Sequence, residues 1–194
     1  MLDQLAIGGV AADWGLFRDG ERWDQLRALY AADAVMRTTW FAGPASEFVD
    51  HCIEGSRRGA KARHFIGATA AGVHGDRAVA DTCMAIMVRA AVAGTEVDVT
   101  CQGRFHDRMV RERGAWRIKL RVPVYDRDRL DPVTPGARLD LDPAVLARFP
   151  EGYRYLAYVQ SLTGASVPPG LPTTHSAEEA TLCAESAAWL AGEG

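Results

Sequence analysis

The residue of this sequence best suited to chemistry is His64. It stands where a short basic connector, residues 57 to 63, passes into an apolar segment that begins with Phe65 and Ile66. A neutral imidazole, with a pKa of about 6.5, accepts a proton at neutral pH, and a carboxylate on its other nitrogen fixes the tautomer and stabilises the imidazolium. We therefore interpret His64 as a candidate general base, with a satisfied structural histidine as the alternative.

Asp13 is a carboxylate inside a helix that the apolar spacing predicts over residues 3 to 18. Phe17 follows it by four residues, so Asp13 shares a helix face with an apolar side chain. An exposed helix carboxylate is the alternative interpretation. The sequence contains no glycine-rich phosphate loop, metal-ligand triad or Ser-His-Asp order. We therefore expect chemistry that uses no cofactor and no metal.

Composition limits the class of protein. The 194 residues, 48% of them hydrophobic, suit one domain with an appendage. A net charge of −3 and scattered arginines offer no basic stripe for a phosphate backbone, so we expect no nucleic-acid partner. The sequence has no apolar run of about 18 residues and no signal-like N-terminus, which predicts a cytoplasmic protein with no membrane partner. The four cysteines show no CxxC spacing and are expected as free, mostly buried thiols: Cys52, Cys83, Cys101 and Cys183.

The order of the predicted elements indicates the fold class. Helical spacing over residues 3 to 18 and again from Trp23 to Tyr30 precedes a strand at 35 to 41 and a helix that Ser46 would cap. Strand patterns then follow at residues 64–73, 77–92, 97–105 and 116–122. Helices first and a meander afterwards predict an α+β fold, in which helices pack on one face of a curved antiparallel sheet.

The C-terminal third has a different character. Residues 126 to 143 read as a surface connection, and a short amphipathic stretch at 144–149 precedes a cluster formed by Tyr153, Tyr155 and Tyr158. A final helix is predicted over residues 177 to 191, with Ser176 as its cap. We therefore divide the chain into a domain of residues 1–130 and an extension of residues 131–194, which we expect to cover a pocket or a subunit interface.

Three segments carry a resemblance to a known family. Residues 13–24, DWGLFRDGERWD, residues 29–34, LYAADA, and residues 114–118, GAWRI, resemble the SnoaL-like branch of the nuclear transport factor 2-like superfamily. The resemblance covers residues 3 to 125 and implies a cone-shaped sheet. Within the superfamily the arrangement is most similar to scytalone dehydratase, bile acid 7α-dehydratase and hexachlorocyclohexane dehydrochlorinase.

The resemblance also implies a set of site residues. Asp13 falls at the position of an aspartate that orients the catalytic histidine, here His64. Arg121 matches a pocket arginine suited to an anionic group or an enolate, and Tyr30 matches an aromatic position of the pocket wall. Five further side chains are expected to line the pocket and bind substrate: Phe17, Trp40, Met84, Cys101 and Phe105.

These expectations lead to a functional prediction. The protein is predicted to be a cofactor-independent lyase of the dehydratase type, which removes a proton from a small, hydrophobic, cyclic or aromatic substrate. The alternatives are a retro-aldol lyase, isomerase or cyclase that uses the same dyad, a non-catalytic ligand-binding protein, or an assembly protein like a dioxygenase β subunit. An exposed sheet face and the tyrosine cluster favour a homo-oligomer, a trimer more than a dimer.

Overall fold

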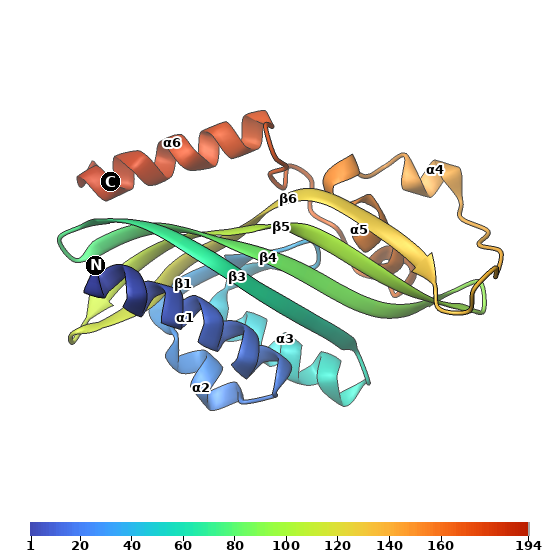
Figure 1. Cartoon of the computed structure of the whole chain (residues 1–194), viewed down its shortest axis with the longest axis horizontal. Helices are drawn as coiled ribbons and strands as arrows, with labels where there is room; N and C mark the ends of the chain where they lie inside the picture. The colour runs from blue at the N-terminus through green and yellow to red at the C-terminus, as the bar shows by residue number, and fades with distance from the viewer. Residues whose placement is uncertain (194) are drawn as a thin grey trace.

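A curved six-stranded sheet with the order β2-β1-β6-β5-β4-β3 organises the chain (Figure 1). The computed structural model describes residues 1–193. The strands are β1 (Tyr30–Arg37), β2 (Ala42–Pro44), β3 (Lys61–His74), β4 (Arg77–Val92), β5 (Thr95–Glu112) and β6 (Ala115–Pro132). Strands β3 to β6 form an antiparallel meander. The fold is therefore α+β, as the sequence predicts.

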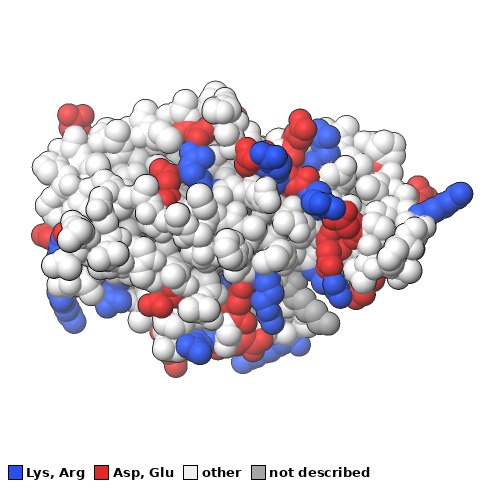
Figure 2. Space-filling view, viewed as in Figure 1, with Lys and Arg blue, Asp and Glu red and all other residues white. Residues whose placement is uncertain are grey.

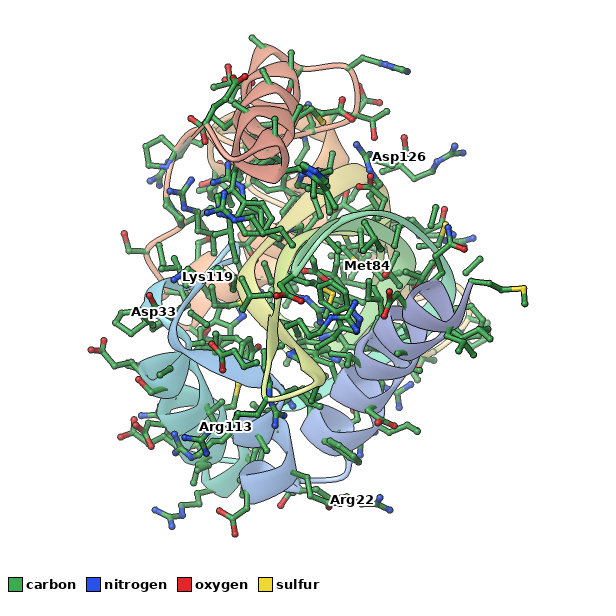
Figure 3. The ribbon with its side chains drawn as sticks, turned by 90° about the vertical axis from the view of Figure 1, so that its left-hand side faces the viewer. Arg22, Asp33, Met84, Arg113, Lys119 and Asp126 are labelled. Atoms are coloured by element: carbon green, nitrogen blue, oxygen red, sulfur yellow. The ribbon has the colours of Figure 1, made fainter. Side chains whose placement is uncertain are left out.

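The sheet is mixed, which corrects the expectation of a purely antiparallel one. β1 runs parallel to β6, and β2 is antiparallel to β1. β1 and β6 are joined by most of the domain instead of a hairpin, so no turn forces them to run in opposite directions. An ion pair between Asp33 of β1 and Lys119 of β6 joins the two strands, and Figure 3 shows the two labelled residues near each other.

Helices cover both faces of the sheet (Figure 1). The helices α1 (Leu2–Asp19), α2 (Trp23–Ala28) and α3 (Ala45–Arg57) lie on one side, and α6 (Ala177–Ala191) crosses the other. The short elements α4 (Pro143–Leu146), η1 (Glu151–Tyr153) and α5 (Arg154–Leu162) gather at one end. None of the helices among residues 1–193 is long and apolar enough to cross a membrane.

Side chains along β6 point alternately to the two faces of the sheet, one covered by α6 and the other facing the interior. Val122 and Val124 pack with Leu182 of α6, whereas Pro123 and Tyr125 point to the opposite face and line an internal cavity. The α6 helix begins as predicted, because the Ser176 hydroxyl accepts a hydrogen bond from the backbone N–H of Glu179 at 3.1 Å.

Two strand boundaries differ from the predictions. β1 begins at Tyr30, which the spacing assigns to the end of a helix. β6 continues through residues 126 to 132, which read as a surface connection, because β5 stays paired with it there, Cys101 opposite Asp128. The alternating charges of that stretch resemble a loop, and only the partner strand makes it extended.

The tyrosine cluster and the cysteines also depart from expectation. Tyr153 and Tyr158 are buried within the chain, so they pack in the core instead of offering an apolar surface to a partner. All four cysteines are free thiols, but only Cys52 and Cys101 are buried, whereas Cys83 and Cys183 are exposed.

Candidate active site

His64 and Asp19 form the best-defined polar pair of the concave side. Nδ1 of His64 lies 2.8 Å from Oδ1 of Asp19, and the backbone N–H of His64 donates to Oδ2 at 2.5 Å. Both carboxylate oxygens therefore hold the same residue. An ionised carboxylate accepts hydrogen bonds only, so Nδ1 carries the proton and Nε2, on the opposite edge of the ring, carries the lone pair. This is the tautomer that a general base requires.

Two glycines place Asp19 beside His64. Gly15 lets α1 approach β3 closely, because a Cβ there would lie 2.5 Å from Cγ1 of Ile66. Gly20 ends the helix where a Cβ would lie 2.8 Å from the carbonyl oxygen of Leu16. Asp19 is the last residue of α1, and His64 lies on β3, the edge strand of the sheet, where its N–H is open to a side-chain acceptor.

The surroundings of His64 keep its imidazole neutral. The pKa of His64 lies below its usual 6.5, chiefly because burial penalises the charged ring, while the Asp19 carboxylate opposes the shift. The positive charges of Arg18 and Arg121 lower this pKa further. The His64 side chain is 9% exposed. A buried and neutral imidazole with a fixed tautomer is suited to accept a proton from a bound molecule.

His64 lines a small cavity of about 50 Å³ with aromatic walls. Trp14 meets the imidazole edge to face, with ring centroids 5.1 Å apart, and Trp40 and Phe48 extend the aromatic surface with centroids 5.3 Å apart. Arg18 is the one arginine among the residues that line this cavity, and Leu156 from α5 also lines it. The cavity therefore combines apolar walls with a base and a cation.

The family is decided by the first 122 residues, which match the model of the SnoaL-like domain. The chain belongs to this family. Two relatives of this SnoaL-like protein are Pea pathogenicity protein 2 of Fusarium vanettenii and an uncharacterized protein of Emericella nidulans. The first is 31% identical over 162 residues, 82% of this chain and 70% of the relative, and the second is 29% identical over 95% of this chain and 81% of the relative.

Solved structures share the fold at low identity. A protein of Novosphingobium aromaticivorans named "Putative Scytalone Dehydratase" superposes with a TM-score of 0.57 at 16% identity, over 72% of this chain and 96% of that one. A protein of unknown function from Mycobacterium tuberculosis gives 0.55 at 15% identity, over 86% and 98% of the two chains. At this identity the likeness concerns the fold alone, which hosts unrelated chemistries.

In this SnoaL-like protein the carboxylate that contacts His64 is not the predicted Asp13. Asp13 is exposed on α1, and the contact expected of it is made by Asp19. The two aspartates are six residues apart, so they project about 120° from each other around the helix. Asp19 followed by glycine reads as a turn, and this reading concealed that α1 extends to Asp19 and ends beside β3.

Arg121 and Tyr30 lie behind the cavity wall and do not line it. Arg121 is fully buried and forms a bidentate ion pair with Asp107, with distances of 2.8 and 2.7 Å. Its guanidinium lies between the rings of Trp14 and Phe105. The Tyr30 hydroxyl accepts a hydrogen bond from Nε1 of Trp14 at 2.6 Å. Both residues hold Trp14 in place, and Arg18 is the arginine that reaches the cavity.

Of the five expected wall residues, Trp40 and Phe105 line the cavity. Met84 is buried in the interior of the curved sheet, as Figure 3 shows, while Ile86 and Val88 of the same strand form the wall. Cys101 packs against η1, where its thiol donates to the carbonyl oxygen of Gly152 at 3.5 Å. Phe17 is half-buried against the core outside the cavity lining, with the Arg22 guanidinium over its ring.

Sequence reasoning missed six polar residues of the site: Arg18, Asp19, Thr38, Thr39, Tyr125 and Gln160. Arg18 is the last residue of the predicted helix from which Asp13 was chosen and Asp19 follows it, so the Arg-Asp-Gly helix end was the available signal. No local signal marks Tyr125 or Gln160, because β6 and α5 meet only in the folded chain. Within the described residues no group of three or more histidine, cysteine, aspartate or glutamate side chains could hold a metal ion.

Proposed function

We propose that this protein is a cofactor-independent lyase of the dehydratase type, with His64 as its general base. The observation that carries the proposal is the pair of hydrogen bonds between Asp19 and His64, which leaves Nε2 as the proton acceptor of a buried ring on the cavity wall. Membership of the SnoaL-like family, which includes dehydratases and isomerases, supports this class of reaction.

The proposed step is an elimination. Nε2 of His64 takes a proton from a carbon next to the carbonyl group of the substrate, and the electrons of that C–H bond pass into an enolate, which then collapses to form the new double bond. The hydroxyl group on the neighbouring carbon departs and receives the proton from the imidazolium, so the products are an unsaturated compound and water. Asp19 stabilises the imidazolium while it exists. No other proton donor is needed for this balance.

Arg18 is proposed to stabilise the enolate that forms after proton removal. Its side chain lines the cavity and is 15% exposed, and its Nη1 lies 4.0 Å from Oδ1 of Asp19. A guanidinium stays charged at every relevant pH and donates to oxygen anions. This role replaces the one expected of Arg121, whose charge is neutralised by Asp107.

The walls favour a flat and hydrophobic substrate, cyclic or aromatic, because aromatic rings stack on other rings. The present cavity of about 50 Å³ is far below the 300 Å³ or more of typical ligand sites. We therefore propose that the C-terminal extension covers the pocket through Leu156 and Gln160 of α5, and that this helix opens to admit the substrate and then returns to its place over it.

The test is deuterium incorporation at acidic C–H positions in heavy water, measured by mass spectrometry on a panel of cyclic β-hydroxy ketones. Wild-type protein should accelerate exchange or loss of water for at least one compound. His64→Ala should lower that rate by about 10²–10⁴-fold. Asp19→Asn should also lower it, and Asp13→Asn, which changes an exposed carboxylate of the same helix, is the matched control and should leave the rate unchanged. Full activity of His64→Ala would show that the base lies elsewhere.

We further propose a homo-oligomer, trimer or dimer, assembled through the outer side of β3 and β4. His64 points into the cavity, so Phe65 points outward, where it is 66% exposed, and Met87 on the neighbouring strand is 39% exposed. Figure 2 shows that uncharged side chains cover a wide area of the face that carries α1 and β3. Exposed apolar side chains such as Phe65 and Met87 favour contact with a second copy.

A further inference from the structure

Two polar atoms in the wall of the cavity have no partner. The hydroxyl oxygen of Tyr125 and the side-chain carbonyl oxygen Oε1 of Gln160 are buried and form no hydrogen bond within the described residues. Both residues line the cavity that contains His64. Thr39 lies close enough to the Tyr125 hydroxyl to lower its pKa, but the contact does not reach the distance and angle of a hydrogen bond. Buried polar atoms are nearly always bonded in folded proteins, so these two need an explanation.

The backbone holds Tyr125 firmly in this orientation. Its N–H donates to the carbonyl oxygen of Pro172 at 3.0 Å, and its carbonyl oxygen accepts from the N–H of Thr174 at 2.8 Å. The Tyr153 ring packs against its ring, with centroids 5.0 Å apart. The free edge of β6 is thus completed by the C-terminal segment. The unpartnered hydroxyl belongs to a fixed side chain and not to a mobile one.

Gln160 is held by the placement of α5. The carboxylate of Asp128 on β6 accepts from the N–H of Leu156 at 2.8 Å, which fixes the first turn of the helix. Gln160 follows Leu156 by four residues and therefore lies on the same helix face, and both line the cavity. Two independent anchors therefore bring two unpartnered oxygens to one cavity.

We propose that Tyr125 and Gln160 form a subsite that binds a hydroxyl group of the substrate. The proposal rests on the proposed function, since it takes the His64 cavity as the substrate site. A hydroxyl group satisfies both residues: its oxygen accepts from the Tyr125 O–H, and its hydrogen donates to Oε1 of Gln160. A ketone or ether oxygen would satisfy only Tyr125. Burial raises the pKa of Tyr125, so its hydroxyl remains a donor.

The subsite lies away from the base. β6, which carries Tyr125, and β3, which carries His64, are separated by two strands in the sheet. Both side chains nevertheless line the same cavity, so one substrate can present its acidic C–H to His64 and a hydroxyl group to the subsite. The chemical class is a hydroxylated cyclic or aromatic compound.

Calorimetric titration with 2-naphthol, 2-methoxynaphthalene and naphthalene tests the subsite without any turnover. Wild-type protein should bind the naphthol about tenfold more tightly than the other two, the value of one good hydrogen bond. Tyr125→Phe and Gln160→Met should each remove most of that preference and leave naphthalene binding unchanged. An unchanged preference in both variants, or no binding of any probe by wild-type protein, would overturn the proposal.

Thermal unfolding separates a binding role from a structural one. Removal of an unpartnered buried hydroxyl should raise the Tm of ligand-free Tyr125→Phe, whereas a hydroxyl that stabilises the fold would give a lower Tm. If Tyr125→Phe does not fold, the proposal is overturned for Tyr125, and Gln160→Met decides the rest. His64→Ala should keep the preference for naphthol. Loss of turnover in that variant with this preference intact tests the proposed reaction separately from the subsite.

Discussion

Burial of the His64 ring gives the site a definite pH dependence. The pKa of His64 is lowered, first by loss of water around the ring and then by the nearby arginines, against the opposing effect of Asp19. The proposed base therefore stays neutral down to a pH lower than 6.5. We expect the acidic limb of a kcat/KM profile to lie below pH 6.5, and a limb at or above 6.5 would contradict the burial argument.

The same shift makes folding depend on pH. Between pH 6.5 and the lower pKa of folded His64, the unfolded chain binds a proton that the folded chain does not, so stability falls as pH falls through this window. Urea unfolding at pH 7.5 and at pH 5.0 measures this effect. Between the higher and the lower pH, the free energy of unfolding should fall further for wild-type protein than for His64→Gln. His51, whose ring bonds to a backbone carbonyl on the exposed surface of α3, provides the control variant His51→Gln, which should behave like wild type.

At the scale of elements, α6 is held on the sheet by a buried polar network. Nδ1 of His106 lies 3.0 Å from Asp81, and its Nε2 lies 2.9 Å from the hydroxyl of Ser186, which also accepts from Nε of Arg108. In space, the contacts from Ser186 to His106 to Asp81 resemble those of a Ser-His-Asp nucleophile triad. Ser186 is only 1% exposed and is occupied by Arg108, so the network stabilises the docked helix instead of meeting a substrate.

Ser186→Ala should loosen α6. The variant leaves His106 and Arg108 without their shared partner in a buried place, and such a loss costs about 1–3 kcal/mol. Urea unfolding measures the cost, and hydrogen exchange should show faster exchange in α6. Thr181→Ala removes an exposed hydroxyl of the same helix, bonded only to Ala177, and should change stability by less than about 0.5 kcal/mol. Equal effects of the two substitutions would contradict the role of the network.

The attachment of α5 should depend on pH through Asp128. Burial raises the pKa of Asp128 from 3.8 to about 6, although the N–H groups of Tyr155 and Leu156 lower it. A raised folded pKa contributes stability that is present below about pH 4 and lost as pH rises through 6. Asp128→Asn should therefore be more stable than wild type at pH 7.5 and similar near pH 4. Asp126→Asn is the control, because Arg127 lowers the pKa of Asp126 and its removal should bring no gain at pH 7.5.

At the scale of the whole molecule, the proposed assembly depends on the outer side of β3 and β4. Light scattering at micromolar concentration should give a mass of two or three times the 21.0 kDa chain. Phe65→Asp places a charge in the proposed contact and should return the protein to 21.0 kDa. Leu162→Asp, at a 51% exposed position of α5, should leave the mass unchanged. A wild-type monomer would rule the assembly out.

The sequence by itself determined most of the elements and singled out His64 as the candidate base. Helical spacing before the meander, the Ser176 cap and a histidine at the start of a strand are local patterns, because a few neighbouring residues decide them. The family resemblance then indicated the fold and the need for an acidic partner of His64. Each of these conclusions depends on residues close together in the chain.

Only the tertiary structure decided which side chains meet. Asp19 replaces Asp13 because Gly15 allows α1 to sit close to β3 and because the helix ends beside the open edge of that strand. Arg121 does not line the cavity, because its guanidinium pairs with the buried carboxylate of Asp107, which lies opposite it on the next strand. Contacts between residues 45 or 14 positions apart depend on strand register and helix position, and these are set by packing of the whole chain rather than by any local pattern.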